Sequence, residues 1–570
     1  MEYLAHLDKE KGYKQLLNEH LKSVANLLYN QIPPTVCFEN INNNIIKKFS
    51  YYLGYIHDIG KYSDYFQEYL KSGTNSRLKN HAHISACFLY NLLIEKANLF
   101  GLSDQDTKII AFLYYLCARR HHNSLETASS LFSNNVNDLK PLQEHLAEKS
   151  KEILLDLDIK ECIEVEKFSN YFCIDSLKEN KIEYMPSRFQ NKRVKDIKWY
   201  FFLIYTFSLL IDMDKLDSAL LKIEETKNVD ANRVTNYLNI KHGNERSDLI
   251  ERREKARKSM IQTIENLTDE EIKNVRFFTL TAPTGIGKTL SSLQSVLLLQ
   301  KRIKEVENYT PKIIVAIPFI NIIEQNRIEY ENVFGEDVKM IVHHRLSDFS
   351  SVYDSADEMP IDKALLRTES WDGDVILTTF VQLFQSIFTG QNRPLKKINK
   401  LAGSIVILDE IQSILLEYMP LIGASLQMMA KYYGTRFVLM TATQPKILEF
   451  GDLLLNKYGY KYDGRKEIQL LPDYEFYFQG LKRTKFIPVL EEELDNDKFI
   501  ELFFEKWSID KSCLIVVNTI KRSIELYNKI KHKSKEKGIN VPVYYLSTNI
   551  LPVKRREVIT EVKKLLDKNE

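Results

Sequence analysis

The sequence has few cysteines, no long apolar run and almost no net charge. None of its six cysteines forms a Cys-x-x-Cys pair, which argues against a zinc knuckle or a disulfide framework. The longest apolar stretch, residues 199–211, is too short to cross a bilayer, so we predict a buried helix and no membrane partner. The first residues lack the apolar core of a signal peptide, and this predicts a cytoplasmic, reduced setting. The formal net charge is only +2, so the overall charge of the protein cannot attract nucleic acid, and any binding would depend on local basic grooves.

Residues 1–245 have the pattern of an all-helical domain. Apolar residues recur every three or four positions over residues 16–29, 50–70 and 83–97, which is the spacing of helices that bury one face. Because a chain of 570 residues is too long for one hydrophobic core, we expect further domains after this one.

The rest of the chain has the pattern of an α/β protein. From about residue 275, short β-branched runs alternate with helical segments, which predicts a parallel sheet covered by helices on both faces. A charged stretch at residues 240–262 and a break near 460–490 divide the chain. We predict an all-helical domain at 1–245, an α/β domain at 246–470 and an incomplete second α/β domain at 471–570. The expected strands lie within residues 275–280, 312–319, 374–380, 404–410, 436–443, 512–519 and 541–548.

The run LTAPTGIGKTL, residues 280–290, is the most informative motif, because it lies between a strand-like and a helix-like stretch. Main-chain N–H groups of such a turn surround nucleotide phosphates, Lys288 would reach the β and γ oxygens, and Thr289 would bind Mg²⁺. Ala282 stands where this motif usually has glycine, a variant that resembles the helicase branch of these ATPases. The residues predicted to bind ATP with Mg²⁺ are Ala282, Pro283, Thr284, Gly285, Ile286, Gly287, Lys288, Thr289, Asp409 and Glu410.

Two further motifs support a helicase-type ATPase. SIVILDEIQ ends a strand with adjacent carboxylates at the carboxyl edge of the sheet, where ligands bind in open α/β folds. Asp409 would hold Mg²⁺, and Glu410 would orient or deprotonate the attacking water. In LMTATQP, the hydroxyls of Thr441 and Thr443 are suited to couple the state of the phosphates to a bound strand.

The segment VILTTFVQLFQSIF, residues 375–388, ends another strand on the same expected edge. Its Thr378, Thr379 and Gln382 are predicted contacts for the phosphates of a single-stranded nucleic acid. An ordinary loop at a strand end is the alternative interpretation of this segment.

The helical part holds histidines and aspartates within or beside apolar helical stretches. His57 and Asp58 are adjacent in YIHDIGKYSDYF, and on a helix their side chains would point about 100° apart and could flank one metal. Burying so many titratable groups is costly unless they are paired or bind a metal. Imidazole and carboxylate suit Mn, Co, Ni, Fe or Mg. We predict a centre for one or two divalent ions with the ligands His20, His57, Asp58, His81, His121, His122 and Asp214.

Hydrolysis of a phosphate ester is the reaction expected at such a centre. Bound metal ions lower the pKa of water and clamp the attacking and leaving oxygens of a phosphodiester. Lys61, one helical turn beyond His57, would neutralise a phosphate oxygen. The predicted catalytic residues are therefore His57, Asp58 and Lys61 in the helical part and Glu410 in the ATPase.

The strings HDIGK, HAHISA, RRHH, DMDK, TAPTGIGKT, DEIQ and LMTATQP together resemble the signature nuclease–helicase of type I CRISPR systems. In that family an HD-type nuclease precedes a superfamily 2 helicase with RecA-like domains. The resemblance implies recruitment by an RNA-guided, Cascade-type surveillance complex, followed by nicking and 3′→5′ degradation of a displaced single DNA strand. It also maps the metal ligands, where His83 competes with His81 and Asp212 with Asp214. His81 is preferred because it lies four residues before Ser85, as in the family string.

The resemblance places a Thr-Gln/Glu-Gly-Asp segment and an Arg-rich motif after residues 546–558, and neither occurs before Glu570. We therefore expect a fragment, a split gene product or an ATPase that another chain supplements. Two other functions stay open: an HD phosphohydrolase that acts on nucleotides and is regulated by the α/β part, and an ATP-binding remnant that docks on a partner complex. Preference for a free nucleotide over DNA would favour the first. ATP binding without hydrolysis, and without a metal in the helical part, would favour the second.

Overall fold

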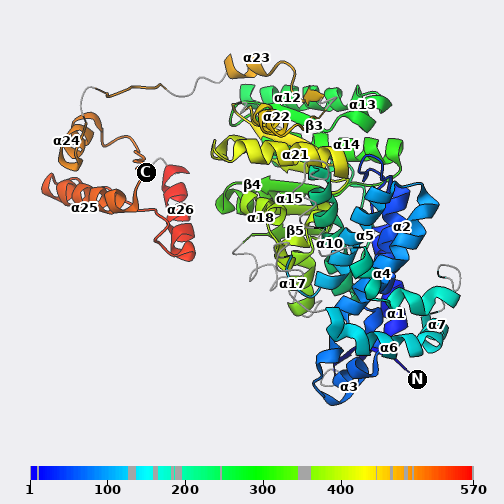
Figure 1. The fold of residues 1–570 in the computed structure, drawn as a ribbon. Helices are drawn as coiled ribbons and strands as arrows, with labels where there is room; N and C mark the ends of the chain where they lie inside the picture. Colours follow the sequence, from blue (N-terminus) through cyan, green and yellow to red (C-terminus); the bar gives the residue numbers. More distant parts are fainter. Residues whose placement is uncertain are drawn as a thin grey trace. The chain divides into compact units, whose positions relative to one another are not determined.

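The chain folds into two compact units, Met1–Leu481 and Lys482–Glu570 (Figure 1). No described helix is long and apolar enough to cross a membrane. The stretch at residues 199–211 lies instead in the buried helix α10 (Ile197–Ser218), as predicted. The computed structural model describes residues 2–8, 12–125, 136–157, 163, 165–180, 185, 196–243, 247–344, 361–443, 446–462, 466–479, 485–490 and 493–567.

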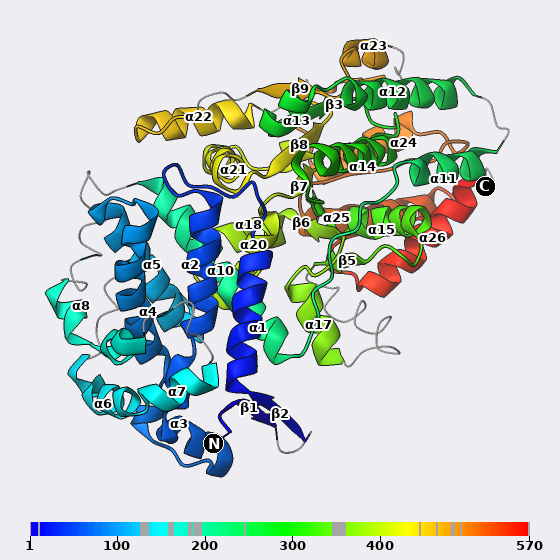
Figure 2. The same cartoon turned by 90° about the vertical axis from the view of Figure 1, so that its right-hand side faces the viewer.

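The N-terminal part of the large unit is helical, as its apolar periodicity predicts. It also has an antiparallel hairpin, β1 (Leu4–Asp8) and β2 (Tyr13–Leu16), which the sequence did not predict and which leads into the first helix (Figure 2). The longer helices pack against one another in pairs, α1 with α2 and α4 with α5. The other elements of this part are α1 (Leu17–Asn30), α2 (Asn43–Ile56), η1 (Ile59–Tyr62), α3 (Asp64–Ser72), η2 (Arg77–Lys79), α4 (Ala82–Ala97), η3 (Asn98–Phe100), α5 (Asp104–Arg120), η5 (Val136–Leu139), α6 (Lys140–Glu148), α7 (Ser150–Leu157), η6 (Val165–Phe172) and α8 (Asp175–Glu179).

The helix predicted over residues 50–70 is interrupted at the His-Asp doublet. α2 ends before His57, Asp58 has φ −118° and ψ 15°, and the short 3-10 helix η1 follows. The next helix has its own N-cap, because the hydroxyl of Ser63 accepts a hydrogen bond from the N–H of Phe66. The expectation that His57 and Asp58 are neighbours within one helix is therefore wrong.

The sheet of the large unit has seven strands, and all its described pairings are parallel. Five strands lie in the predicted runs, whereas the short β5 and β9 were not predicted. The order across the sheet is β5-β6-β4-β7-β8-β3-β9, so the phosphate loop, the carboxylate motif and the threonine motif end three neighbouring strands, β3, β7 and β8. The strands are β3 (Phe277–Thr281), β4 (Ile313–Ile317), β5 (Met340–His343), β6 (Val375–Thr379), β7 (Ile405–Leu408), β8 (Arg436–Thr441) and β9 (Glu467–Gln469).

The two faces of the sheet belong to different hydrophobic cores, because side chains alternate across each strand. Phe277 and Ile314 share one core with the helical part, whereas Phe278 and Val315 face a second core. Since the first core is continuous across both parts, the domain boundaries at residues 245 and 470 stay predictions. The helices of this part are α11 (Asn232–His242), α12 (Asp248–Glu265), α13 (Asp269–Asn274), α14 (Lys288–Glu307), α15 (Ile320–Phe334), α17 (Ile361–Glu369), α18 (Phe380–Ile387), α19 (Asn392–Leu395), α20 (Ile398–Leu401), η8 (Ile411–Ser413), α21 (Met419–Tyr433), α22 (Ile447–Lys457) and α23 (Tyr474–Gln479).

The small unit has three described helices, α24 (Asn496–Lys506), α25 (Ile520–Glu536) and α26 (Pro552–Asp567). The strands predicted at residues 512–519 and 541–548 do not form, although every residue of both ranges is described. An apolar run becomes a strand when it is paired and buried, yet Leu514 is 85% exposed and Val516 is 80% exposed. These two strand predictions are therefore wrong.

Candidate metal centre and nucleotide site

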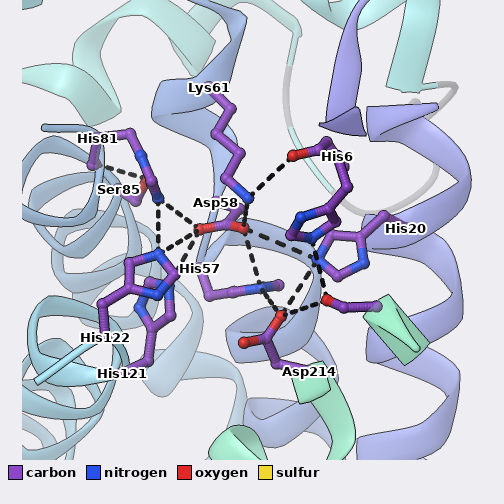
Figure 3. A network of polar contacts seen from close by, with 12 residues as sticks. His6, His20, His57, Asp58, Lys61, His81, Ser85, His121, His122 and Asp214 are labelled. Atoms are coloured by element: carbon purple, nitrogen blue, oxygen red, sulfur yellow. Dashed lines mark hydrogen bonds and ion pairs between the residues drawn. The ribbon is translucent and has the colours of Figure 1, made fainter. Parts of the chain in front are cut away.

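All seven predicted metal ligands lie in one cluster in the helical part (Figure 3). They come from distant places in the chain: α1, the end of α2, the segment before α4, the end of α5, and α10. They form two groups, and within each group one ligand atom of every residue lies within 4.8 Å of the others. The first group is Asp58, His81, His121 and His122, and the second is His20, His57, Asp58 and Asp214.

Asp58 belongs to both groups and is fully buried. Its Oδ1 lies 2.9 Å from Nε2 of His81 and 3.1 Å from Nε2 of His121. Its Oδ2 lies 3.5 Å from Nε2 of His57 and 3.7 Å from Nε2 of His20. Each carboxylate oxygen thus faces a different set of imidazoles, an arrangement that suits two cations joined by one carboxylate.

Hydrogen bonds on the far side of the rings orient the histidines. Nδ1 of His57 donates to the carbonyl oxygen of Gly54 at 2.8 Å, and Nδ1 of His121 donates to that of Ala118 at 2.7 Å. In this tautomer the lone pair on Nε2 faces the cluster and is free to bind a metal.

Asp217 orients a third histidine and was missed by the sequence analysis. Its Oδ2 accepts from Nδ1 of His20 at 2.7 Å and from Nε2 of Gln15 at 2.8 Å, and its Oδ1 accepts from Ser23. A signal was available, because Asp217 lies three residues after Asp214 on α10 and therefore on the same helix face.

The buried ligand atoms have few partners of their own. Among the described residues, Nε2 of His20, of His57 and of His121 makes no hydrogen bond. A buried polar atom without a hydrogen bond costs about 1–3 kcal/mol, and a divalent cation would use these lone pairs together. Imidazole nitrogen and carboxylate oxygen are donors that such an ion accepts, so the residues fit the predicted metal.

Positive charge balances the carboxylates of the cluster. Nζ of Lys61 lies 2.6 Å from Oδ2 of Asp58. Burial opposes the ionisation of Asp58, but Lys61 and the surrounding histidines outweigh it and hold its pKa well below the usual range. Burial also opposes protonation of His20, but the neighbouring carboxylates of Asp214, Asp217 and Asp58 raise its pKa to about 10. A divalent cation would therefore replace a proton on His20.

His81, rather than His83, lies in the cluster. The Oγ of Ser85 donates to the carbonyl oxygen of His81 at 2.9 Å and accepts from the N–H of Gly60 at 2.9 Å. His83 faces elsewhere, with Nε2 3.0 Å from the hydroxyl of Tyr115, and burial lowers its pKa to about 3.

Asp214, rather than Asp212, lies in the cluster. Oδ1 of Asp214 is 3.4 Å from Nε2 of His20 and 3.7 Å from Nε2 of His57. Asp212 points toward α20, where its Oδ2 pairs with Nζ of Lys400 at 2.9 Å. The two aspartates of the DMD string thus have different partners.

His122 is the one exposed member of the two groups, and its side chain is 37% exposed. Its Nε2 lies 3.0 Å from Nε2 of His81 and 3.9 Å from Oδ1 of Asp58. The other six ligands are buried. The cluster therefore reaches the surface of the protein at His122.

The predicted phosphate loop joins β3 to α14, as its pattern indicates. Gly285 and Gly287 both have φ +84°, a backbone conformation that favours glycine. Lys288 begins α14, and its Nζ lies 3.5 Å from Oε1 of Glu410 at the end of β7. The residues that run from β3 into the first turn of α14 are Ala282, Pro283, Thr284, Gly285, Ile286, Gly287, Lys288 and Thr289.

The carboxylate and threonine motifs meet through Gln412, which the sequence analysis missed. Burial and the charge of Glu410 raise the pKa of Asp409 to about 6. Glu410 has φ +53°, an uncommon and strained value for a residue other than glycine. Gln412 donates to Oε2 of Glu410 and accepts from Oγ1 of Thr441 at 2.6 Å. The N–H of Thr443 donates to the same hydroxyl at 3.0 Å, so the two motifs form one network.

A cavity of about 450 Å³ opens beside the phosphate loop. Its lining includes Gly287 and Thr289 of the loop and Leu238, Arg253 and Gln325 from the surrounding helices. Nε of Arg253 donates to the carbonyl oxygen of Gly285 at 2.9 Å. The volume is that of a small-ligand pocket, and its position suits the nucleoside of a bound nucleotide.

The predicted nucleic-acid contacts differ in their accessibility. Thr378 is fully buried, and its hydroxyl donates to the carbonyl oxygen of His343 at 2.8 Å. Thr379 caps α18 by accepting from the N–H of Gln382 at 3.1 Å. Oε1 of the half-buried Gln382 accepts from Nζ of Lys397 at 3.1 Å. Thr379 is also buried, so Gln382 is the one predicted contact of the three that is partly exposed.

Comparisons with known proteins show similarity to helicases and to Cas3 proteins. Residues 257–450 match the family described as DEAD/DEAH box helicase. Over 261 residues the chain is 31% identical to the CRISPR-associated nuclease/helicase Cas3 of Haloferax volcanii, and the match covers 42% of this chain and 28% of the relative. The chain therefore matches less than a third of that relative's length.

Two crystal structures of T. fusca Cas3 are similar in fold. The complex with AMPPNP has a TM-score of 0.58 and 13% identity, and the match covers 99% of this chain and 67% of that one. The complex with ADP has the same TM-score and identity, and the match covers 98% of this chain and 67% of that one. The chain is therefore similar in sequence to a Cas3 nuclease/helicase over 42% of its length and similar in fold to T. fusca Cas3, and its residues 257–450 match the DEAD/DEAH box helicase family.

Proposed function

We propose that this chain cleaves single-stranded DNA at a metal centre in its helical part and degrades the strand with an ATP-driven helicase motor. We also propose that an RNA-guided CRISPR surveillance complex recruits it to a displaced DNA strand in the cytoplasm. One observation carries the proposal: a buried cluster of histidines and aspartates, with Asp58 shared between two groups of ligands, in a chain that also holds a DEAD/DEAH box helicase domain.

The metal centre would perform the cleavage. Bound divalent ions would supply a hydroxide at neutral pH and stabilise negative charge on the phosphate. The side chains of the two groups would hold these ions, and Asp58 would lie between them. A phosphodiester would approach at His122, where the cluster is exposed. Lys61 is buried against Asp58, and it would therefore act by fixing that carboxylate.

The nucleotide site would drive the motor. Lys288 would contact the β and γ phosphates, while Thr289 and Asp409 would hold Mg²⁺. Glu410 would orient the attacking water. Hydrogen bonds through Gln412 and Thr441 would link Glu410 to the edge of the sheet that we assign to the DNA strand.

The first test of the proposal is the variant Asp58→Ala. It should abolish cleavage of single-stranded DNA in Mn²⁺ and leave ATP binding unchanged, because Asp58 is the only residue in both ligand groups. The control Asp104→Ala removes an exposed carboxylate from the first turn of α5 and should cut DNA normally. Cutting by Asp58→Ala at the wild-type level would refute the site. Preferential cleavage of a free nucleotide by the wild type would instead favour the phosphohydrolase.

The second test separates the two sites. Lys288→Ala should retain metal-dependent nicking and lose ATP-stimulated degradation, because Nζ of Lys288 lies beside Glu410 in the nucleotide site. The control Lys301→Ala removes an exposed charge from the same helix. If Lys288→Ala also lost metal-dependent nicking in the absence of ATP, the two sites would not be separate. If the wild-type protein bound ATP without hydrolysing it and bound no metal, this would favour an ATP-binding remnant that docks on a partner complex.

A further inference from the structure

The turn that carries two predicted metal ligands is bonded to the helicase domain. His121 and His122 open the turn after α5, and the chain reaches Leu125 three residues later. The N–H of Leu125 donates to the carbonyl oxygen of Gly390 at 2.8 Å. Nδ2 of Asn392 donates to the carbonyl oxygen of His121 at 3.1 Å. Both ends of the turn are thus hydrogen-bonded to the helicase part, one to Gly390 before α19 and the other to Asn392, the first residue of α19.

The close approach of the two segments depends on Gly390. A Cβ atom at this position would lie 2.2 Å from the carbonyl oxygen of Leu125, well inside van der Waals contact. On its other side the turn is held by Arg120, whose guanidinium donates to the carbonyl oxygen of Ser124 at 2.8 and 3.0 Å. Any larger residue at position 390 would therefore push the turn and the helicase segment apart.

The helicase side of this contact is itself fixed. The hydroxyl of Tyr200 on α10 donates to the carbonyl oxygen of Ile387 at the end of α18, at 2.6 Å. On α19, Leu395 is fully buried in the core that both parts share. Gly390 lies between these two anchored helices and Asn392 begins the second, so both can fix the position of the turn.

We propose that Gly390 and Asn392 are positioning residues that hold the turn with His121 and His122 in place for metal binding. This inference rests on the proposed function of the cluster as a metal centre. The imidazole of His121 is oriented by a hydrogen bond to Ala118, so a shift of its main chain would turn Nε2 away from Asp58. Residues that orient ligands in this way change metal affinity by about 10–100-fold.

The test uses the full chain and titration calorimetry with Mn²⁺. Asn392→Asp places a carboxylate oxygen against the carbonyl oxygen of His121, and Gly390→Ala inserts the clashing methyl group. Both variants should weaken one class of Mn²⁺ sites about 10–100-fold and leave the other class unchanged. The affected class should be the one that His121→Ala removes. The neighbouring control Gln391→Ala changes an exposed side chain and should bind as wild type.

Two further measurements make the outcomes distinct. ATP binding should match wild type in both variants, and so should the thermal unfolding midpoint of Asn392→Asp, since a general loss of structure would weaken both classes of site. Unchanged Mn²⁺ binding in both variants, or equal weakening of both classes with a lower midpoint, would overturn the inference. A selective loss of Mn²⁺ in a protein that never cuts DNA would support the positioning role and contradict the proposed function. Normal Mn²⁺ binding by both variants, where the wild-type protein cuts DNA, would contradict the positioning role and support the proposed function.

Discussion

The two ring nitrogens of His20 have different partners. Nδ1 bonds to Asp217 at 2.7 Å, whereas Nε2 faces Asp58 and Asp214 and has no hydrogen bond among the described residues. A carboxylate behind a ligating imidazole fixes its tautomer and raises its basicity. The contribution of His20 to a metal site therefore depends on Asp217.

We predict that Asp217→Asn weakens Mn²⁺ binding at the group of His20, His57, Asp58 and Asp214. An amide keeps the shape of the side chain but removes the charge that holds His20, so the affinity should fall about 10–100-fold. Titration calorimetry measures the change. The control Glu19→Gln removes the same charge at an exposed position next to His20. Equal affinity in Asp217→Asn and wild type would contradict a role for Asp217 at this centre.

The candidate ligands could be predicted from sequence, but the residues that orient them could not. The His57-Asp58 doublet and the His121-His122 pair are unusual beside apolar helices, so their residue types were informative. Asp217 and Gln412 are ordinary polar residues, and each acts only through a neighbour. Their importance comes from tertiary packing, which brings Asp217 to His20 across 197 positions of the chain and Gln412 to Thr441 across 29.

At the scale of elements, five buried strands could be predicted, whereas two apolar runs outside a buried sheet were wrongly predicted as strands. β4 and β7 are fully buried, so their apolar runs reflect burial on both faces. The runs at residues 512–519 and 541–548 are also apolar but remain unpaired, the first largely exposed and the second largely half-buried. The helix expected over residues 50–70 failed for another reason. Its apolar spacing continues through η1 and α3, while the backbone bends at Asp58 to bring that carboxylate among the histidines.

The contact between α10 and α20 contains a buried ion pair, and we predict that breaking it destabilises the large unit. The side chains of Asp212 and Lys400 are 0% and 3% exposed. Lys400→Met would leave the Asp212 carboxylate buried without its cation, which should lower the free energy of unfolding by about 3–5 kcal/mol. Urea unfolding measures this change.

A matched control and a rescue variant make this prediction specific. Lys431→Met removes a partly exposed ion pair with Glu39 between the same two parts of the protein, and exposed pairs contribute about 0–1 kcal/mol. The double variant Asp212→Leu and Lys400→Met removes both charges and should recover most of the lost stability. Equal stability of Lys400→Met and Lys431→Met would show that the buried pair has no special role.

At the scale of the whole molecule, both candidate sites lie in the unit Met1–Leu481. The first hydrophobic core runs from the helical part to one face of the sheet, so the two sites are built on a continuous packed interior. A ligand that binds only the native form of such a unit stabilises all of it, because the free energy of binding is lost when the unit unfolds.

We therefore predict that Mn²⁺ raises the unfolding midpoint of the wild-type protein after treatment with a chelator. A concentration of 100 times the dissociation constant should add about 2.7 kcal/mol to the free energy of unfolding. Asp58→Ala should show no such increase, because the loss of Asp58 removes a ligand from both groups. Lys288→Ala should respond as wild type, since its substitution leaves the metal ligands in place. An equal rise in Asp58→Ala would mean that Mn²⁺ stabilises the protein elsewhere, and the cluster would then be an internal network of charges and not a metal centre.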